Sequence, residues 1–155
     1  PPPPPAHPPH PLSSAASDVY KRQLYNDMMA KSQVRKAVMQ AVASYHRPLA
    51  LMLQATPDAQ RHQEEADEFG LPLMFEAFAD RCYDDDGRLL SRSKPGAVHD
   101  RGRMLAQVEQ LQREGTVTTV SGHVIPLQAD TLCVHGDNLE GVQAIQAIRA
   151  LVDGR

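Results

Sequence analysis

The chain has 155 residues, a formal net charge of −3 and two cysteines. This length fits one domain of ordinary size, and its interspersed charges lack the basic patch of a nucleic-acid-binding protein. Its apolar runs are much shorter than the ~20 residues of a membrane span, and two isolated cysteines exclude a disulfide framework. We therefore expect a cytoplasmic globular protein with no nucleic-acid or membrane partner.

The amino-terminal segment differs in composition from the rest. Eight of the thirteen prolines lie within residues 1–11, and the first glycine is Gly70. A proline-rich stretch without apolar periodicity predicts an extended, unpacked coil. The following segment, Ser13 to Gln23, resembles a translated cloning adaptor. We predict that residues 1–23 form a disordered tail outside the fold, and the alternative is a natural tail that recruits a proline-binding domain.

Helical and extended patterns then alternate. Apolar residues at helical spacing predict a helix over residues 27–45, ended by Pro48. The wholly apolar run 49–53 predicts a strand buried on both faces of a parallel sheet. Thr56 is expected to cap a helix that stops at Gly70. A second apolar run, 73–75, predicts a strand that ends at Glu76.

The second half continues the alternation. Residues 86–87 predict a turn between extended pieces at 81–83 and 88–90. An amphipathic helix carrying apolar residues from 104 to 111 should close at Gly115. Residues 116–120 and 123–127 should form a hairpin around a two-residue turn at 121–122. A strand at 131–134 leads to a helix lined by apolar residues from 142 to 152, with Asp137 and Glu140 as its capping box.

Repeated strand–loop–helix units predict an α/β fold whose parallel sheet is either open or curled into a barrel. Roughly 130 residues supply about half of a barrel of ~250 residues. If the fold is a barrel, we expect the chain to be incomplete.

Two loops at the carboxyl ends of predicted strands carry polar residues, which is where such folds place their sites. The first loop follows Glu76, whose partly desolvated carboxylate is either a proton-transfer group or an ion-pair partner of Arg81 or Arg92. Asp80 with Arg81 is a candidate for positioning a substrate carboxylate or phosphate, because a guanidinium matches either anion. Arg92 either binds an anion or belongs to a solvated basic loop.

The second loop carries His135, Gly136 and Asp137. His135 is a candidate acid or base, and Asp137 either caps the helix or orients the imidazole. No further histidine or cysteine falls at a metal-binding spacing, so we predict no metal site. The sequence has no Walker-type phosphate loop, so ATP would be bound in another manner or by a partner.

Three segments resemble the LamB/YcsF family. Residues 75–100, FEAFADRCYDDDGRLLSRSKPGAVHD, resemble its E-x-F-A-D-R-x-Y motif and the R-x-x-x-G-A that follows. Residues 128–138, QADTLCVHGDN, resemble its terminal C-V-H-G-D motif, and residues 24–30, LYNDMMA, resemble the end of its L-Y-N stretch. The resemblance covers residues 24–155 and implies the C-terminal half of a seven-stranded barrel-like fold related to glycoside hydrolases and deacetylases.

The resemblance also implies an activity. The family opens the lactam ring of 5-oxo-L-proline to give L-glutamate, with ATP hydrolysis and with 5-oxoprolinase subunits B and C as partners. It implies two sets of site residues: catalytic Glu76, His135 and Asp137, and substrate- or phosphate-binding Asp80, Arg81 and Arg92.

The family's N-terminal motifs, D-L-N-x-D and C-G-F-H-x-G-D, are missing from this chain. We therefore expect an inactive half barrel of poor solubility. The alternatives are a metal-dependent deacetylase-like hydrolase and a non-catalytic module that docks on partner subunits.

Overall fold

The computed structural model describes residues 23–154, and the chain divides into two compact units, residues 1–38 and 39–155. The tail predicted over residues 1–23 lies outside the described residues except for Gln23, which is helical. Residues 23–30 are helical, and Lys31 separates them from α2 (Ser32–Ala43). The single helix predicted over 27–45 is therefore wrong. Arg35 Nη1 donates to the carbonyls of Met28 and Met29, at 2.9 and 3.3 Å, which a continuous helix would use for its own backbone bonds.

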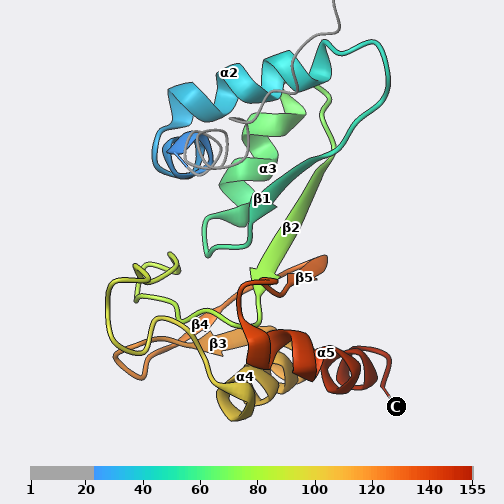
Figure 1. Cartoon of the computed structure of the whole chain (residues 1–155). Helices are drawn as coiled ribbons and strands as arrows, with labels where there is room; N and C mark the ends of the chain where they lie inside the picture. The colour runs from blue at the N-terminus through green and yellow to red at the C-terminus, as the bar shows by residue number, and fades with distance from the viewer. Residues whose placement is uncertain (1–22, 155) are drawn as a thin grey trace, which may run out of the picture. The chain divides into compact units, whose positions relative to one another are not determined.

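The predicted parallel sheet is confirmed in the second unit (Figure 1). Strands β1 (Leu51–Gln54), β2 (Leu73–Phe78) and β5 (Thr131–Cys133) are parallel and lie in the order β1-β2-β5. Helix α3 (Ala59–Asp67) connects the first two strands. The central strand β2 therefore carries its carboxyl end to the same edge of the sheet as β5.

Strand β2 is longer than the sequence pattern predicts. It runs to Phe78, and Glu76 lies inside it, paired with Gln54 on one side and Thr131 on the other. The prediction that the strand ends at Glu76 is wrong, because burial of Ala77 and Phe78 continues the extended backbone past the one polar residue. The loop with site chemistry consequently begins two residues later, at Ala79.

The prediction that the first strand is buried on both faces of the sheet is also wrong. Leu53 is fully buried, whereas Met52 and its sheet neighbour Met74 are 41% and 37% exposed. Adjacent strand residues point to opposite faces. One face of the sheet is therefore packed at this end, and the other is open.

Helix α3 starts later than predicted. Its N-cap is Asp58, while Thr56 accepts a hydrogen bond from the Asp58 amide at 3.2 Å in the turn before it. The helix ends at Asp67, three residues before the predicted stop at Gly70, which lies in the turn that follows and has a φ of 61°, which favours glycine.

The next segments hold the strand-end loop in place. Tyr83 bridges Leu89 across the predicted turn at 86–87, which is confirmed. Helix α4 (Arg101–Glu114) ends at Gly115 as predicted. It leads into an antiparallel hairpin of β3 (Thr116–Thr118) and β4 (Val124–Pro126). The hairpin's strands are shorter than predicted, because Thr119 donates its N–H to His123 across a wider turn.

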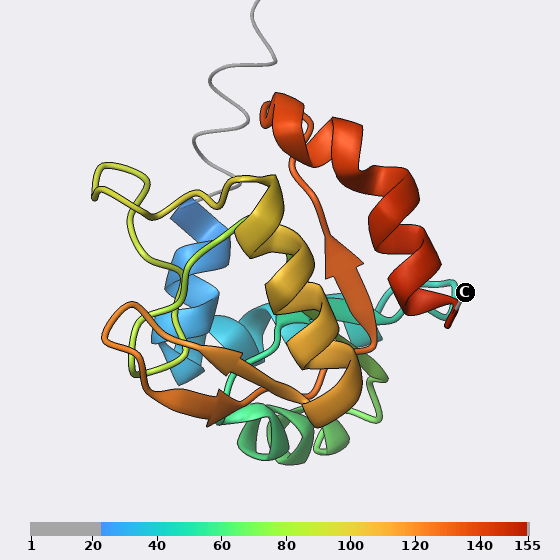
Figure 2. The ribbon, with the colours of Figure 1, turned by 90° about the horizontal axis from the view of Figure 1, so that it is seen from below.

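Helix α5 (Leu139–Val152) closes the fold, and it runs beside α4 (Figure 2). Their shared core contains Met104, Val108, Ala144 and Ile148, packed around Ala79. This packing places the start of α5 next to the segment that follows β2. Within residues 23–154, no helix has the length and apolar character to cross a membrane.

Candidate functional site

Two loops meet at the carboxyl edge of the sheet. Phe78, the last residue of β2, pairs with Cys133, the last residue of β5. The N–H of Ala79 then donates to the Cys133 carbonyl at 2.9 Å, which extends the pairing by one residue. Because the two strands are parallel neighbours, the residues that follow them emerge together. Asp80 and His135 are thereby brought into contact.

The Asp80–His135 pair is the best-defined polar contact of the site. Both carboxylate oxygens of Asp80 lie near Nδ1 of His135, at 2.9 and 3.0 Å, and Oδ2 also accepts the His135 backbone N–H at 3.4 Å. Asp80 is completely buried, and the ring of Phe78 stacks on the imidazole with centroids 5.6 Å apart. An ionised carboxylate only accepts, so Nδ1 carries the proton and Nε2 of the neutral ring keeps its lone pair. The arrangement can present Nε2 as a base.

Asp137 does not do what either sequence interpretation expects. The N-cap of α5 is the next residue, Asn138, whose side chain accepts from the Gly141 amide at 3.2 Å. The carboxylate that orients His135 is Asp80. Asp137 instead pairs with Arg92, whose Nη1 lies 2.5 Å from Oδ2. Both the capping and the orienting predictions for Asp137 are therefore wrong, because this ion pair holds its carboxylate.

The predicted capping box is also absent, because the Glu140 carboxylate is bonded to another helix. Glu140 Oε2 accepts the backbone N–H of Arg101 at 2.7 Å, at the first turn of the neighbouring helix α4. A carboxylate at a helix N-terminus satisfies an otherwise unpaired donor. Glu140 therefore connects the two helices at the rim of the site and does not cap its own helix.

The Arg92–Asp137 ion pair is accessible to solvent, with 40% and 64% of the two side chains exposed. The hydrogen bond from Arg92 lowers the pKa of Asp137 below its ordinary value. Exposed ion pairs are weak, because water and salt screen them. An anionic ligand can therefore compete with Asp137 for the Arg92 guanidinium.

Arg81 is placed differently from Arg92. It is buried, and its guanidinium donates to the carbonyls of Leu90 at 2.6 Å and Ala97 at 3.3 Å. Burial, followed by the nearby Arg92, lowers the pKa of Arg81. These bonds tie the loop over residues 88–97 to the end of β2. Anion binding by Arg81 stays a prediction. Two of its three guanidinium nitrogens already donate to backbone carbonyls.

Glu76 lies two residues before Phe78 in β2 and is half-buried. By strand alternation it shares a face with Phe78, the residue that stacks on His135. Neither Glu76 nor His135 is among the residues that line the hollow described next, although Asp80, which contacts His135, is one of them. The structure therefore places Glu76 on the same side of the sheet as His135 but does not bring it into the hollow with Asp80.

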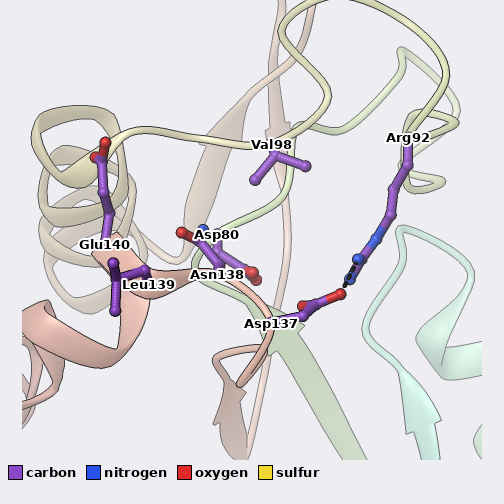
Figure 3. A pocket seen from close by; sticks show the side chains of 7 residues that line it. All are labelled: Asp80, Arg92, Val98, Asp137, Asn138, Leu139 and Glu140. Carbon is purple, nitrogen blue, oxygen red and sulfur yellow. Dashed lines mark hydrogen bonds and ion pairs between the residues drawn. The ribbon is translucent and has the colours of Figure 1, made fainter.

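A hollow of about 390 Å³ opens beside Asp80 (Figure 3). In Figure 3, Arg92 and Asp137 point toward each other across one side, with Val98 above and Glu140 on the far side. The lining residues are Asp80, Arg92, Val98, Asp137, Asn138, Leu139 and Glu140. This volume suits a small metabolite. The sequence indicated three of these residues as site candidates, Asp80, Arg92 and Asp137. It did not indicate the first turn of α5 as part of the site, because Glu140 was interpreted there as part of a capping box.

Metal ligands do not cluster in the part of the chain that the structure describes. No group of three or more histidine, cysteine, aspartate or glutamate side chains there is arranged to hold an ion.

Comparison with known proteins gives a consistent result. The LamB/YcsF family model matches residues 21–155. The A subunit of 5-oxoprolinase from Pseudomonas fluorescens strain Pf0-1 is 51% identical over 127 residues, which are 81% of this chain and 51% of that protein. The second-numbered A subunit of 5-oxoprolinase from Pseudomonas putida KT2440 is 50% identical over 132 residues, which are 84% of this chain and 51% of that protein.

A solved structure is similar as well. The crystal structure of the lactam utilization protein from Thermus thermophilus has a TM-score of 0.69 and 27% identity. The match covers 84% of this chain and 51% of that one. The chain thus spans about half the length of the relatives it matches.

Proposed function

We infer that this chain, which belongs to the LamB/YcsF family, acts as the C-terminal half of the A subunit of a 5-oxoprolinase and takes part in hydrolysing 5-oxo-L-proline to L-glutamate. One observation carries the proposal. Over more than four fifths of the chain, about half of the aligned residues are identical to those of proteins named as the A subunit of 5-oxoprolinase. The site supports it by supplying a base and a cation beside a hollow of metabolite size.

The reaction requires a proton acceptor. Water adds to the ring carbonyl carbon of the lactam, the ring C–N bond breaks, and the nitrogen takes up a proton to become the amine of glutamate. We propose that Nε2 of His135 accepts the proton of the attacking water. Asp80 holds the opposite ring nitrogen in its protonated form, and the stacked Phe78 fixes the plane of the ring.

The substrate also carries a carboxylate, which remains unchanged in the reaction. We propose that this carboxylate binds the guanidinium of Arg92 in place of Asp137, because a guanidinium offers two parallel donors to a carboxylate. Asp137 would hold Arg92 in position until the substrate arrives. Like His135, Glu76 does not line the hollow. It is the least supported of the catalytic candidates because His135 is held by Asp80, which does line it.

ATP fits this hollow poorly. Its lining has three carboxylates, on Asp80, Asp137 and Glu140, against the single guanidinium of Arg92. A polyphosphate placed there would meet like charges. We therefore propose that ATP is bound by subunits B and C or by the part of the family protein that this chain does not cover. The parallel strands joined through α3 would be one section of a barrel-like sheet.

The test is a chimaera. Residues 24–155 replace the matching part of the Pseudomonas fluorescens relative, and the product is combined with its partner subunits and ATP. We expect glutamate to form from 5-oxo-L-proline. His135→Ala should lower kcat by at least ~100-fold, the usual contribution of a general base.

The matched control is His123→Ala, because the His123 side chain is 72% exposed and lies in the hairpin turn. Equal turnover by the two variants would show a non-catalytic docking module. Turnover abolished by a chelator and restored by zinc would favour a metal-dependent deacetylase-like hydrolase.

A further inference from the structure

Gln107 of α4 connects the helix to the backbone around Asp80. It is 6% exposed, and its side-chain nitrogen donates to the carbonyls of Phe78 at 2.8 Å and Arg81 at 2.9 Å. The carbonyl of Ala79, at 3.3 Å, shares the same donor. These carbonyls belong to the residues on either side of Asp80. One side chain therefore fixes the backbone before and after the carboxylate that holds His135.

His99 sets the direction of the Gln107 amide. Nε2 of His99 lies 3.2 Å from Gln107 Oε1, and because that oxygen only accepts, Nε2 must carry the hydrogen. In the described residues, Nδ1 of His99 is buried with no hydrogen-bond partner. Burial also lowers the pKa of His99, which favours the neutral ring. A reversed amide would place Oε1 against three carbonyl oxygens.

His99 adds a bond of its own to the same segment. Its backbone N–H donates to the Asp80 carbonyl at 3.0 Å. All four carbonyls from Phe78 to Arg81 are thus bonded by Gln107 or by the backbone of His99. The bond from His99 belongs to an isolated β-bridge between Arg81 and Val98, whereas no helix or strand supplies the bonds from Gln107. Three of the four carbonyls of this segment are therefore held by the Gln107 side chain.

The geometry points to Gln107 as a positioning residue, which fixes the segment from Phe78 to Arg81 and so the direction in which Asp80 holds His135. Its effect on turnover rests on the proposed function, whereas its effect on the Asp80–His135 contact does not. Misplacing a reacting group by ~1 Å costs on the order of 100-fold in rate. We therefore expect Gln107→Met to lower kcat about 10- to 100-fold and to leave KM within a few fold.

The first test needs no activity. In the full 155-residue chain, nitrogen NMR of the His135 ring reports which nitrogen carries the proton. We expect the Nδ1–H form in the unaltered chain and a mixture of tautomers in Gln107→Met, which keeps the volume and removes the donors. The matched control is Gln110→Met, since Gln110 lies on the same helix and, among residues 23–154, its side chain bonds the hydroxyls of Thr116 and Thr118 and not the segment around Asp80. Unchanged His135 signals in Gln107→Met would overturn the proposal.

A second measurement covers the case in which Gln107→Met does not fold. In the unaltered chain, the two side-chain amide protons of Gln107 should exchange with water as slowly as the backbone amides of β2. Exchange as fast as that of the exposed Gln146 side-chain amide would overturn the proposal. The chimaera separates this proposal from the proposed function. If Gln107→Met loses the Nδ1–H tautomer of His135 and the unaltered chimaera forms no glutamate, the positioning role is supported and only the 5-oxoprolinase assignment is rejected.

Discussion

Replacing Tyr83 by phenylalanine tests how the end of β2 is held. The Tyr83 ring is completely buried, and its hydroxyl oxygen accepts the backbone N–H of Phe78 at 2.8 Å. The substitution keeps the ring in the core that it shares with Ala55, Val117 and Leu127. It leaves the Phe78 N–H buried without an acceptor, which costs ~1–3 kcal/mol.

Because the ring stays in place, no cavity term is added to that cost. For a chain of this size each kcal/mol lowers Tm by roughly 2–4 °C, so Tm should fall by roughly 2–12 °C. Thermal unfolding of the 155-residue chain followed by circular dichroism measures the change. The control is Tyr45→Phe, since Tyr45 is 51% exposed, and it should shift Tm very little. Equal Tm values for the two variants would refute the reasoning.

Three further predictions concern partly or fully buried groups and a helix cap. Burial lowers the pKa of His99, so as pH falls below about 6.5 the His99 imidazole takes up a proton more readily in the unfolded chain than in the folded one. Denaturant unfolding should therefore show a free energy of unfolding that falls from pH 7 to 5, and that falls less steeply in His99→Asn. Burial raises the pKa of Cys133 to about 11, so at pH 8 it should react with an aromatic disulfide far more slowly than free cysteine. Asn138→Ala should cost ~0.5–2 kcal/mol of unfolding free energy by removing the cap of α5, and Asp137→Ala should cost less.

The existence of the sheet strands and their parallel direction followed from the sequence, because short apolar runs alternate with amphipathic helices. The ends of the elements did not. Glu76 interrupts an apolar run, and only its neighbours Gln54 and Thr131 on the two flanking strands show that the sheet continues past it. Asp137 and Asn138 are equally competent caps, and the contact that decides between them comes from Arg92, 45 residues away.

The site was predicted as a set of residues and not as a set of contacts. Placement after strands indicated Asp80 and His135, but their pairing joins positions 55 residues apart. Gln107 was missed, although a signal was present. It lies three residues after Met104 and four before Leu111, which puts a polar side chain on the apolar face of α4. Buried polar residues of this kind need partners, and here the partners are the carbonyls around Asp80.

The most direct test of the account is the kcat of Asp80→Asn in the chimaera with its partner subunits. The variant keeps the shape of the side chain, but its amide can donate to Nδ1 of His135 and so favour the opposite tautomer, which has no lone pair on Nε2. The account predicts that kcat for glutamate formation falls by on the order of 100-fold or more while Tm stays near that of the unaltered chimaera. An unchanged kcat would contradict it, because His135 would then not depend on the Asp80 carboxylate.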